Sequence, residues 1–299
     1  MVKRLISADA SEILRMNALE LKKSIQASEG RVVLSENVAG RESFIGDITN
    51  AEIAKAFGAD LILLNGLDVF VPDIFGLDVQ GEKVVQRLHE LVGSPIGVNL
   101  EPVDLELDML EERLEISSGR QANQASFERI NQLQFDFVCL TGNPGTGVSN
   151  RSIVQAIQLA KQHFTGLIIA GKMHGAGSNE AVVDLSSVAA FIQAGADVIL
   201  VPAVGTVPGF DLSDLKEVVK LAHQNDVLVM STIGTSQESS AITTIQQIAL
   251  QNKIAGVDIQ HIGDAGYGGV APVENIYEMS KVLRGMRHTV SRMARSVNR

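Results

Sequence analysis

The apolar residues of this chain divide it into eight short β-rich runs separated by longer amphipathic segments. The runs begin 27 to 40 residues apart, and their near-continuous apolar character is typical of strands buried on both faces. They are Val32–Val38, Ala59–Asn65, Pro95–Glu101, Phe135–Gly142, Gly166–Met173, Ala196–Ala203, Val227–Gly234 and Gly256–Gly263. Parallel strands of this kind need a crossover of a dozen or more residues between them, usually a helix.

The segments between the runs have the periodicity of helices. Asn150–Phe164 places Ile153, Ile157 and Ala160 on one stripe, as expected for a helix with one buried face. Similar patterns predict helices at Ala181–Ala194, Leu212–Asn225, Ser239–Asn252 and Val273–Arg284. Eight such units predict an α/β fold, a single (β/α)8 TIM barrel over residues 1–299. An open doubly wound sheet is the alternative, but no G-x-G-x-x-G motif follows the first run.

Three segments lie outside this repeat. Residues 1–30 contain an amphipathic stretch, 8–29, which predicts an extra N-terminal helix covering the N-terminal end of the barrel. Residues 102–121 follow the third run and contain six acidic residues, so they predict either a lid over the active-site mouth or a solvated acidic helix. Residues 284–299 form a basic tail with five arginines and no acid. We interpret the tail either as an anion-, membrane- or partner-binding arm or as the solvated end of the last helix.

Composition narrows the class of protein. The chain is 45% apolar, which excludes a disordered protein, and no apolar run is long enough to span a bilayer. The net charge is −10, with −15 on the residues before the tail, so nucleic acid is not an expected partner. The single cysteine, Cys139, excludes an intramolecular disulfide and fits a core position in the fourth run. We expect a cytoplasmic protein without a signal peptide.

Polar residues interrupt the carboxyl ends of the predicted strands, where TIM barrels build their active sites. Buried polar groups cost free energy unless they are paired, so their concentration at one end predicts a functional mouth. From this position we expect substrate contacts from Glu36, Asn99, Thr141 and Asn143, and a proton-transferring role for Glu101.

The sequence Lys172-Met173-His174 ends the fifth run and gives the sharpest chemical signal. Strand alternation places Lys172 and His174 on one face, with Met173 opposite. If that face is the inner one, Lys172 can form a Schiff base or bind an anionic group, and His174 can move protons near neutral pH. The structural alternative is an ion pair between Lys172 and Glu101 or Glu36.

Glycine-rich loops follow the fourth, seventh and eighth runs. In many barrels the last two of these loops hold a phosphate through backbone N–H groups. We therefore predict phosphate binding by Gly234, Thr235, Gly263 and Gly266, against the alternative of ordinary turns.

A metal site is a weaker prediction. Glu36, Glu101 and His174 could converge as ligands of Mg²⁺, Mn²⁺ or Zn²⁺. No H-E-x-x-H motif or spaced Cys/His set is present, so no cofactor is certain and an Mg²⁺ requirement is left open.

Several segments resemble, in pattern and order, those of the BtpA/SgcQ family of cytoplasmic TIM-barrel proteins. They include ADLILLNGLDVFVP, PIGVNL, FDFVCLTGNPGTGV, ADVILVPAVGTVPGFDLSDLK and VLVMSTIGTSQESS. The resemblance implies a phosphate-binding type of barrel. The chain departs from the family in two places. The His- and Pro-rich motif after the first strand is absent, and Met173 separates Lys172 from His174, which are adjacent in that family.

These observations lead to three hypotheses. The first is a lyase or isomerase that transfers a proton next to the carbonyl of a small phosphorylated metabolite, with Lys172, His174 and Glu101 as catalytic residues. The second is an Mg²⁺-dependent enzyme of the phosphoenolpyruvate-mutase type, with Glu36 and Glu101 near the metal. The third is a non-catalytic barrel that binds a metabolite and regulates or scaffolds a partner through the acidic insert and the basic tail. We expect a homo-oligomer that binds neither nucleic acid nor membranes.

Overall fold

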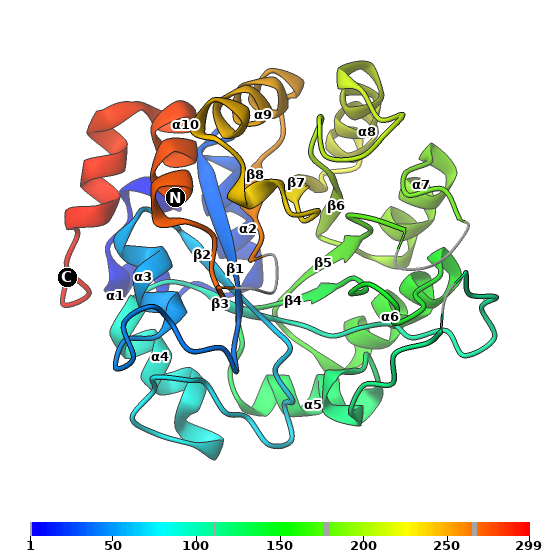
Figure 1. The fold of residues 1–299 in the computed structure, drawn as a ribbon, viewed down its shortest axis with the longest axis horizontal. Helices are drawn as coiled ribbons and strands as arrows, with labels where there is room; N and C mark the ends of the chain where they lie inside the picture. The colour runs from blue at the N-terminus through cyan, green and yellow to red at the C-terminus, as the bar shows by residue number, and fades with distance from the viewer. Residues whose placement is uncertain (1, 111, 176–179, 265–267) are drawn as a thin grey trace.

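A computed structural model describes residues 2–110, 112–175, 180–264 and 268–299, and its centre is a closed barrel of eight parallel strands (Figure 1). Each strand pairs with its neighbour in chain order, and β1 pairs with β8. The strands are β1 Val32–Val38, β2 Leu61–Asn65, β3 Ile96–Asn99, β4 Phe137–Leu140, β5 Leu167–Gly171, β6 Val198–Pro202, β7 Leu228–Ile233 and β8 Ile259–Ile262. The predicted (β/α)8 barrel is confirmed, and the open sheet is wrong.

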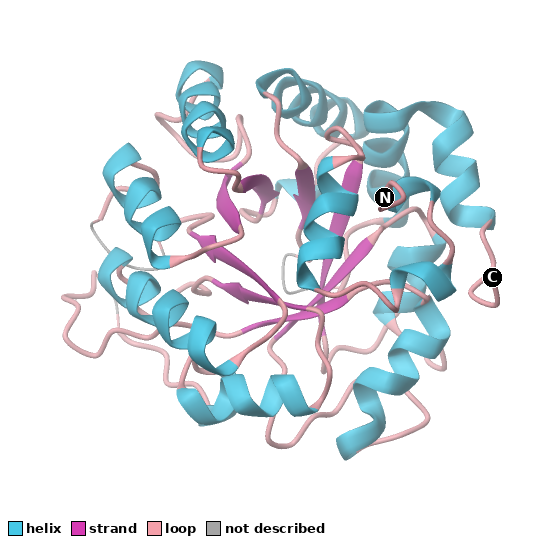
Figure 2. Cartoon of the chain, turned by 180° about the vertical axis from the view of Figure 1, so that it is seen from behind, coloured by secondary structure: helices cyan, strands magenta, loops and turns pink. Residues whose placement is uncertain are grey.

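Helices surround the strands on the outside (Figure 2). They are α3 Asn50–Ala56, α4 Val84–Val92, α5 Gln124–Gln132, α6 Asn150–His163, α7 Leu185–Ala194, α8 Leu212–Gln224, α9 Ile242–Ala255 and α10 Val273–Ala294. Apolar residues from alternate positions of the strands form two cores, one inside the barrel and one between strands and helices. Cys139 is buried in the inner core, as predicted, and burial raises the pKa of its thiol. None of the described helices is both long and apolar enough to cross a membrane.

The N-terminal end of the barrel is closed by two helices instead of the one predicted over 8–29. They are α1 Ala10–Ile13 and α2 Ala18–Gln26, preceded by a 3₁₀ turn, Leu5–Ser7. Asn17 breaks the predicted helix because its side chain accepts the backbone N–H of Glu20 and caps a new helix. The predicted covering role is confirmed, since Leu21 and Ile25 of α2 pack into the inner core.

Four aspartates hold the strands together in pairs at the N-terminal end of the barrel. Each stands just before an even-numbered strand, and its carboxylate accepts a backbone N–H from an odd-numbered neighbouring strand. The pairs are Asp60 with Val33, Asp136 with Ile96, Asp197 with Ile168 and Asp258 with Val229, at 2.9, 2.7, 3.1 and 2.9 Å. Two residues before each aspartate the backbone has a positive φ, at Gly58, Gln134, Gly195 and Gly256. This contact, repeated four times, explains why the sequence Gly-Ala-Asp precedes both β2 and β6.

Two of the five arginines in the basic tail are buried. Helix α10 continues to Ala294 through a kink at Gly285, where φ is 70°. Arg284 and Arg292 are 6% and 1% exposed, and both guanidinium groups donate to Asp60, at 2.5 and 2.7 Å. The interpretation of the tail as a solvated helix end is wrong for these two arginines, because they are buried and paired with a carboxylate inside the protein.

The acidic insert forms no α-helix in its described residues, 102–110 and 112–121, so the predicted solvated helix is wrong there. It lies against the loop before α6 instead. The carboxylate of Asp104 accepts the hydroxyl of Ser149 at 2.5 Å and the guanidinium of Arg151 at 3.1 Å. A short 3₁₀ turn, Ser118–Arg120, ends the insert and brings Arg120 to the mouth of the barrel.

Candidate active site

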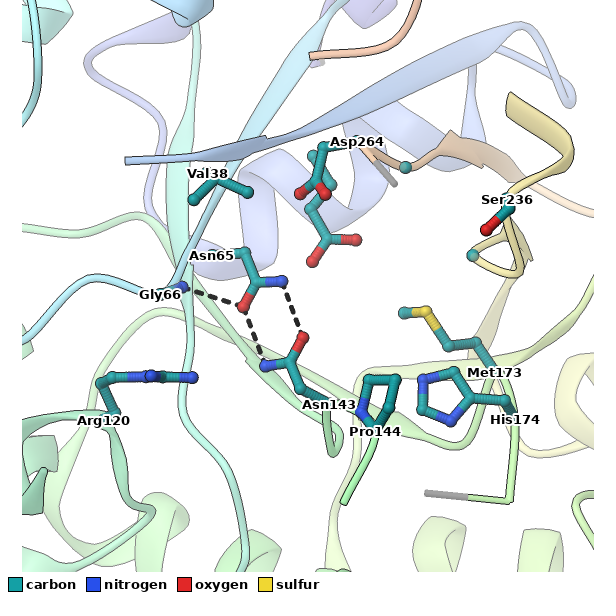
Figure 3. Close-up of a pocket in the computed structure, with 13 residues that line it drawn as sticks. Val38, Asn65, Gly66, Arg120, Asn143, Pro144, Met173, His174, Ser236 and Asp264 are labelled. Atoms are coloured by element: carbon teal, nitrogen blue, oxygen red, sulfur yellow. Dashed lines mark hydrogen bonds between the residues drawn. The ribbon is translucent and has the colours of Figure 1, made fainter. Parts of the chain in front are cut away.

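A pocket of about 490 Å³ opens at the carboxyl ends of the strands (Figure 3), which is within the usual size range of small-molecule sites. Its walls come from the loops after β1, β2, β4, β5, β7 and β8 and from the acidic insert. The lining residues are Glu36, Val38, Asn65, Gly66, Arg120, Asn143, Pro144, Met173, His174, Gly234, Ser236, Gly263 and Asp264. The pocket therefore lies where the fold predicts the active site.

One wall of the pocket is a hydrogen-bonded network around Glu101. The amide groups of Asn65 and Asn143 exchange two hydrogen bonds, at 2.9 and 3.1 Å (Figure 3). The carboxylate of Glu101 accepts both the side-chain and the backbone N–H of Asn143 at 2.8 Å, and it accepts the guanidinium of Arg120 at 2.9 Å. Glu101 itself is 1% exposed and lies behind the lining residues. Glu101 thus holds Arg120 and Asn143, which both line the pocket, in place.

At the base of the pocket Glu36 is paired with His261. Oε2 of Glu36 and Nε2 of His261 are 2.6 Å apart, so a proton lies between them. Glu36 lines the pocket and is 5% exposed, whereas His261 is fully buried behind it. The other ring nitrogen of His261, Nδ1, has no hydrogen-bond partner among the described residues. A carboxylate held this way is a candidate for accepting a proton from a bound molecule.

Glu238 places a further carboxyl group beside this pair. It is fully buried, and neither of its carboxyl oxygens has a hydrogen-bond partner within the described ranges. Burial raises the pKa of Glu238, the nearby charge of Glu36 raises it further, and His261 opposes the shift. Glu36 in the pocket lining and the fully buried Glu238 are thus two carboxyl groups in different environments, which is a common property of acid–base sites.

The structure places Lys172 and His174 in different surroundings, although the charge of Lys172 still helps to lower the pKa of His174, after burial as the main cause. Inward-facing positions of β5 are Leu167 and Ile169, and the same alternation places Met173 in the inner core and Lys172 on the outer side. Lys172 is 2% exposed and lies outside the pocket, where its Nζ donates to Glu180 at 2.5 Å. The prediction that Lys172 and His174 share a face is wrong. β5 ends at Gly171, so strand alternation no longer applies at His174, where the backbone bends and the residue lines the pocket. The ion pair of Lys172 also differs from the predicted one with Glu101 or Glu36.

His174 lines the pocket, as expected for a proton-transferring group (Figure 3). Burial lowers the pKa of its imidazole below the usual 6.5, while the charges of Glu36 and Glu101 partly oppose this shift. This shift favours the neutral imidazole, which can accept a proton.

Asn99 and Thr141 lie behind the pocket wall. Asn99 is 3% exposed, and its amide nitrogen is placed to donate to the carbonyl oxygens of Cys139 and Thr141, at 2.9 and 3.2 Å. Thr141 is 2% exposed. Neither residue lines the pocket, so of the four predicted substrate-binding residues Glu36 and Asn143 are brought to it.

Of the predicted phosphate-binding residues, Gly234 and Gly263 line the pocket. A Cβ atom at Gly234 would lie 2.1 Å from Sδ of Met173, and one at Gly263 would lie 2.8 Å from the carbonyl oxygen of Ile233. Close packing therefore favours glycine at both positions, whatever they bind, and most strongly at Gly263, where the close atom is a backbone oxygen. The hydroxyl of Thr235 donates to the carbonyl of Thr206 at 3.0 Å, and Gly266 lies outside the described residues.

The described residues contain no group of three or more His, Cys, Asp or Glu side chains arranged to hold a metal ion. Mg²⁺, however, is commonly bound through one or two carboxylates together with waters and substrate phosphates. Glu36 and Asp264 both line the pocket, and Arg120 is the one Lys or Arg among its described lining residues. Counted as formal charges, two carboxylates against one guanidinium make this described lining slightly negative.

Four residues of this site, Arg120, His261, Asn65 and Asp264, have no role in the hypotheses drawn from the sequence. The sequence places His261 at the carboxyl end of the eighth run, as a titratable group inside an apolar strand, but assigns it no role. Arg120 could not be placed at the mouth from the sequence, because it reaches the pocket only through the path of the acidic insert.

The family model described as Domain of unknown function (DUF7916) matches residues 6–299 of the chain. No curated protein sequence is significantly similar to this chain. Solved structures are similar at low sequence identity. One is a 2,3-dimethylmalate lyase, described as a PEP mutase/isocitrate lyase superfamily member, with 12% identity over 87% of this chain and 83% of that chain and a TM-score of 0.53.

Two further similar structures are aldolases. An archaeal fructose 1,6-bisphosphate aldolase has 13% identity over 86% of this chain and 95% of that chain, with a TM-score of 0.55. A Schiff base forming fructose-1,6-bisphosphate aldolase has 12% identity over 86% of this chain and 96% of that chain, also with a TM-score of 0.55. Identities this low show a shared fold alone. The resemblance of the sequence to the BtpA/SgcQ family stays a prediction.

Proposed function

The chain belongs to the family described as Domain of unknown function (DUF7916), and we propose that it is a lyase or isomerase that transfers a proton next to a carbonyl. The observation that carries this proposal is the Glu36–His261 pair, buried at the base of a pocket at the carboxyl ends of the strands. Fold alone gives only a weak prior for function, but three of the structures with this fold are described as lyases or aldolases.

In the proposed reaction Glu36 removes a proton from the carbon beside the carbonyl, and His261 orients the carboxylate and shares its proton. Negative charge then develops on the carbonyl oxygen. Arg120 is the donor that can stabilise it, because Glu101 fixes its guanidinium at the pocket wall. His174 moves the second proton, to or from the oxygen or the leaving group.

Lys172 has no catalytic role in this proposal. Its Nζ is engaged by Glu180 outside the pocket, so it cannot reach a carbonyl bound against Glu36 without breaking an ion pair in which the lysine is buried. This separates the proposed reaction from the Schiff-base chemistry of one similar aldolase.

We propose a small phosphorylated metabolite as the substrate, in line with the fructose bisphosphate of the similar aldolases. The backbone at Gly234 and Gly263 is accessible to an anion. The negative lining of the pocket favours a second candidate, in which Mg²⁺ held by Glu36 or Asp264 brings the phosphate into the pocket. In that case the enzyme is Mg²⁺-dependent, as in the phosphoenolpyruvate-mutase type of reaction.

Proton exchange in D₂O tests the proposal without knowledge of the final product. We expect the protein to catalyse deuterium incorporation beside the carbonyl of at least one compound in a panel of triose phosphates, pentose phosphates and phosphorylated 2-oxo acids, followed by proton NMR. Loss of exchange in a chelator, restored by Mg²⁺, would select the second candidate. Saturable binding of a panel member without any exchange would contradict both and favour a non-catalytic, metabolite-binding barrel.

The pH dependence of exchange should report His174. Because burial lowers the pKa of His174 below 6.5, its neutral form persists to lower pH than that of a free histidine, and the rate should fall only below that value. In the variant His174→Gln the rate should be lower and this acidic limb should be absent. The measurement is the pH profile of kcat/KM for both proteins. An acidic limb that is identical in the two proteins would rule out His174 as its source.

A further inference from the structure

A very small cavity lies at the opposite, N-terminal end of the barrel, between α1, α3 and the C-terminal segment. The centre of a water molecule can move within about 10 Å³ of this cavity. This is room for one water molecule or one monatomic ion. Three cationic side chains line it, those of Lys55, Arg292 and Arg295. No acidic residue is among its described lining residues.

Two N–H groups of this cluster lack an acceptor in the part of the chain that the structure describes. Nε of Arg292 donates to Asp60 at 2.7 Å and Nη1 donates to the carbonyl oxygens of Leu5 and Ala8, but Nη2 is buried and has no partner among the described residues. Nε of Arg295 is likewise buried without a partner within the described ranges. A buried donor without an acceptor is costly, and here Arg292 is 1% exposed.

The charges of the described residues around the cavity do not balance. Four cations, Lys55, Arg284, Arg292 and Arg295, face two carboxylates: Asp60, shared by Arg284 and Arg292, and Asp9, paired with Arg295. Lys55 forms no ion pair with any described residue. Burial, and next the charge of Arg292, lower the pKa of Lys55 from 10.5 to about 7. The positive charge of Lys55 is therefore unfavourable while the cavity contains no counter-charge.

We propose that this cavity binds one small monatomic anion of the size of chloride, held by Lys55, Arg292 and Arg295. An anion accepts from the unpartnered N–H groups and offsets the excess positive charge, whereas a water molecule does only the first. The size of the cavity excludes phosphate and other polyatomic anions. The bound anion joins α3 to the C-terminal segment and stabilises the barrel at the end away from the candidate active site.

Thermal unfolding of the full chain in sodium chloride and in sodium gluconate at equal ionic strength tests this proposal. We expect the Tm to rise by about 3 °C between low and about 300 mM chloride, and to saturate, because an anion that binds only the folded state stabilises it by mass action. Gluconate is too large for the cavity and should give no such rise. Equal Tm values in the two salts would overturn the proposal.

Two further measurements locate the effect. Lys55→Met should reduce the chloride-specific rise by about half or more, while Arg287→Met, which removes an exposed cation from the same C-terminal helix, should leave it unchanged. A crystal of the unaltered protein soaked in sodium bromide should show anomalous scattering among Lys55, Arg292 and Arg295, which keeps the test valid if Lys55→Met does not fold. A cavity that holds only water in that crystal would contradict the proposal.

Discussion

Replacing Glu36 by glutamine should lower the rate of deuterium incorporation beside the substrate carbonyl by about 10²- to 10⁴-fold, which is the usual contribution of a positioned general base. The change preserves the shape of the side chain and a hydrogen bond to His261, which lies 2.6 Å away. It removes the basic oxygen that faces the pocket. Because Glu36 is the member of the pair that lines the pocket, substrate binding should change much less than the rate.

The matched control for this variant is Glu42→Gln. Glu42 is an exposed carboxylate on the loop after the same strand, and it does not line the pocket. Its replacement should leave the exchange rate and the circular dichroism spectrum unchanged. If Glu36→Gln is folded by the same spectrum and still exchanges at the unaltered rate, the Glu36–His261 pair is not the base and the proposed mechanism fails.

The barrel could be predicted because its signal is local and repeated. Near-continuous apolar runs at even spacing leave few arrangements that bury both faces of every strand, and each predicted run contains an observed strand. The predicted ends of the strands were less accurate. The run Phe135–Gly142, for example, contains β4 over Phe137–Leu140 only, because Asp136 belongs to the contact with the neighbouring strand.

The face on which a strand residue lies was harder to predict. A shift of one position moves a side chain to the other side of the sheet, so the apolar pattern around Lys172 did not decide between pocket and outer layer. The structure decides it through Met173, which continues the inner series of β5. Glu36 was identified as a mouth residue, but its partner His261 is 225 positions away, and that contact exists only in the closed barrel.

Long-range ion pairs explain the error about the basic tail. Five arginines without an acid in residues 284–299 resemble a solvated or partner-binding segment. Their counter-charge, Asp60, stands more than 200 positions earlier and serves a second purpose as one of the four strand-pairing aspartates. The Gly-Ala-Asp motif is visible in the local sequence. The contact of its aspartate with two buried guanidinium groups is not, because the arginines are distant along the chain.

Asp60→Ala should therefore destabilise the barrel far more than the equivalent change at any other of the four aspartates. It leaves the guanidinium groups of Arg284 and Arg292 buried without a counter-charge, a change that typically costs about 3–5 kcal/mol of unfolding free energy. Asp197→Ala is the matched control, because Asp197 makes the same backbone contact, to Ile168, without an arginine. It should cost about 1–3 kcal/mol. Urea unfolding followed by circular dichroism measures both values.

Acid titration tests the same charge through the pH dependence of stability. Burial alone would raise the pKa of Asp60, but Arg284 and Arg292 hold it below the ordinary 3.8. The stabilisation from this carboxylate is therefore complete above pH 3.8 and is lost as the pH falls through the lower value of the folded protein. Asp60→Asn, which keeps an acceptor for Val33 but no charge, should be less stable than the unaltered protein above about pH 4 and approach it in more acidic solution. Equal losses for Asp60→Ala and Asp197→Ala, together with a pH-independent effect of Asp60→Asn, would show that the two arginines do not depend on this charge.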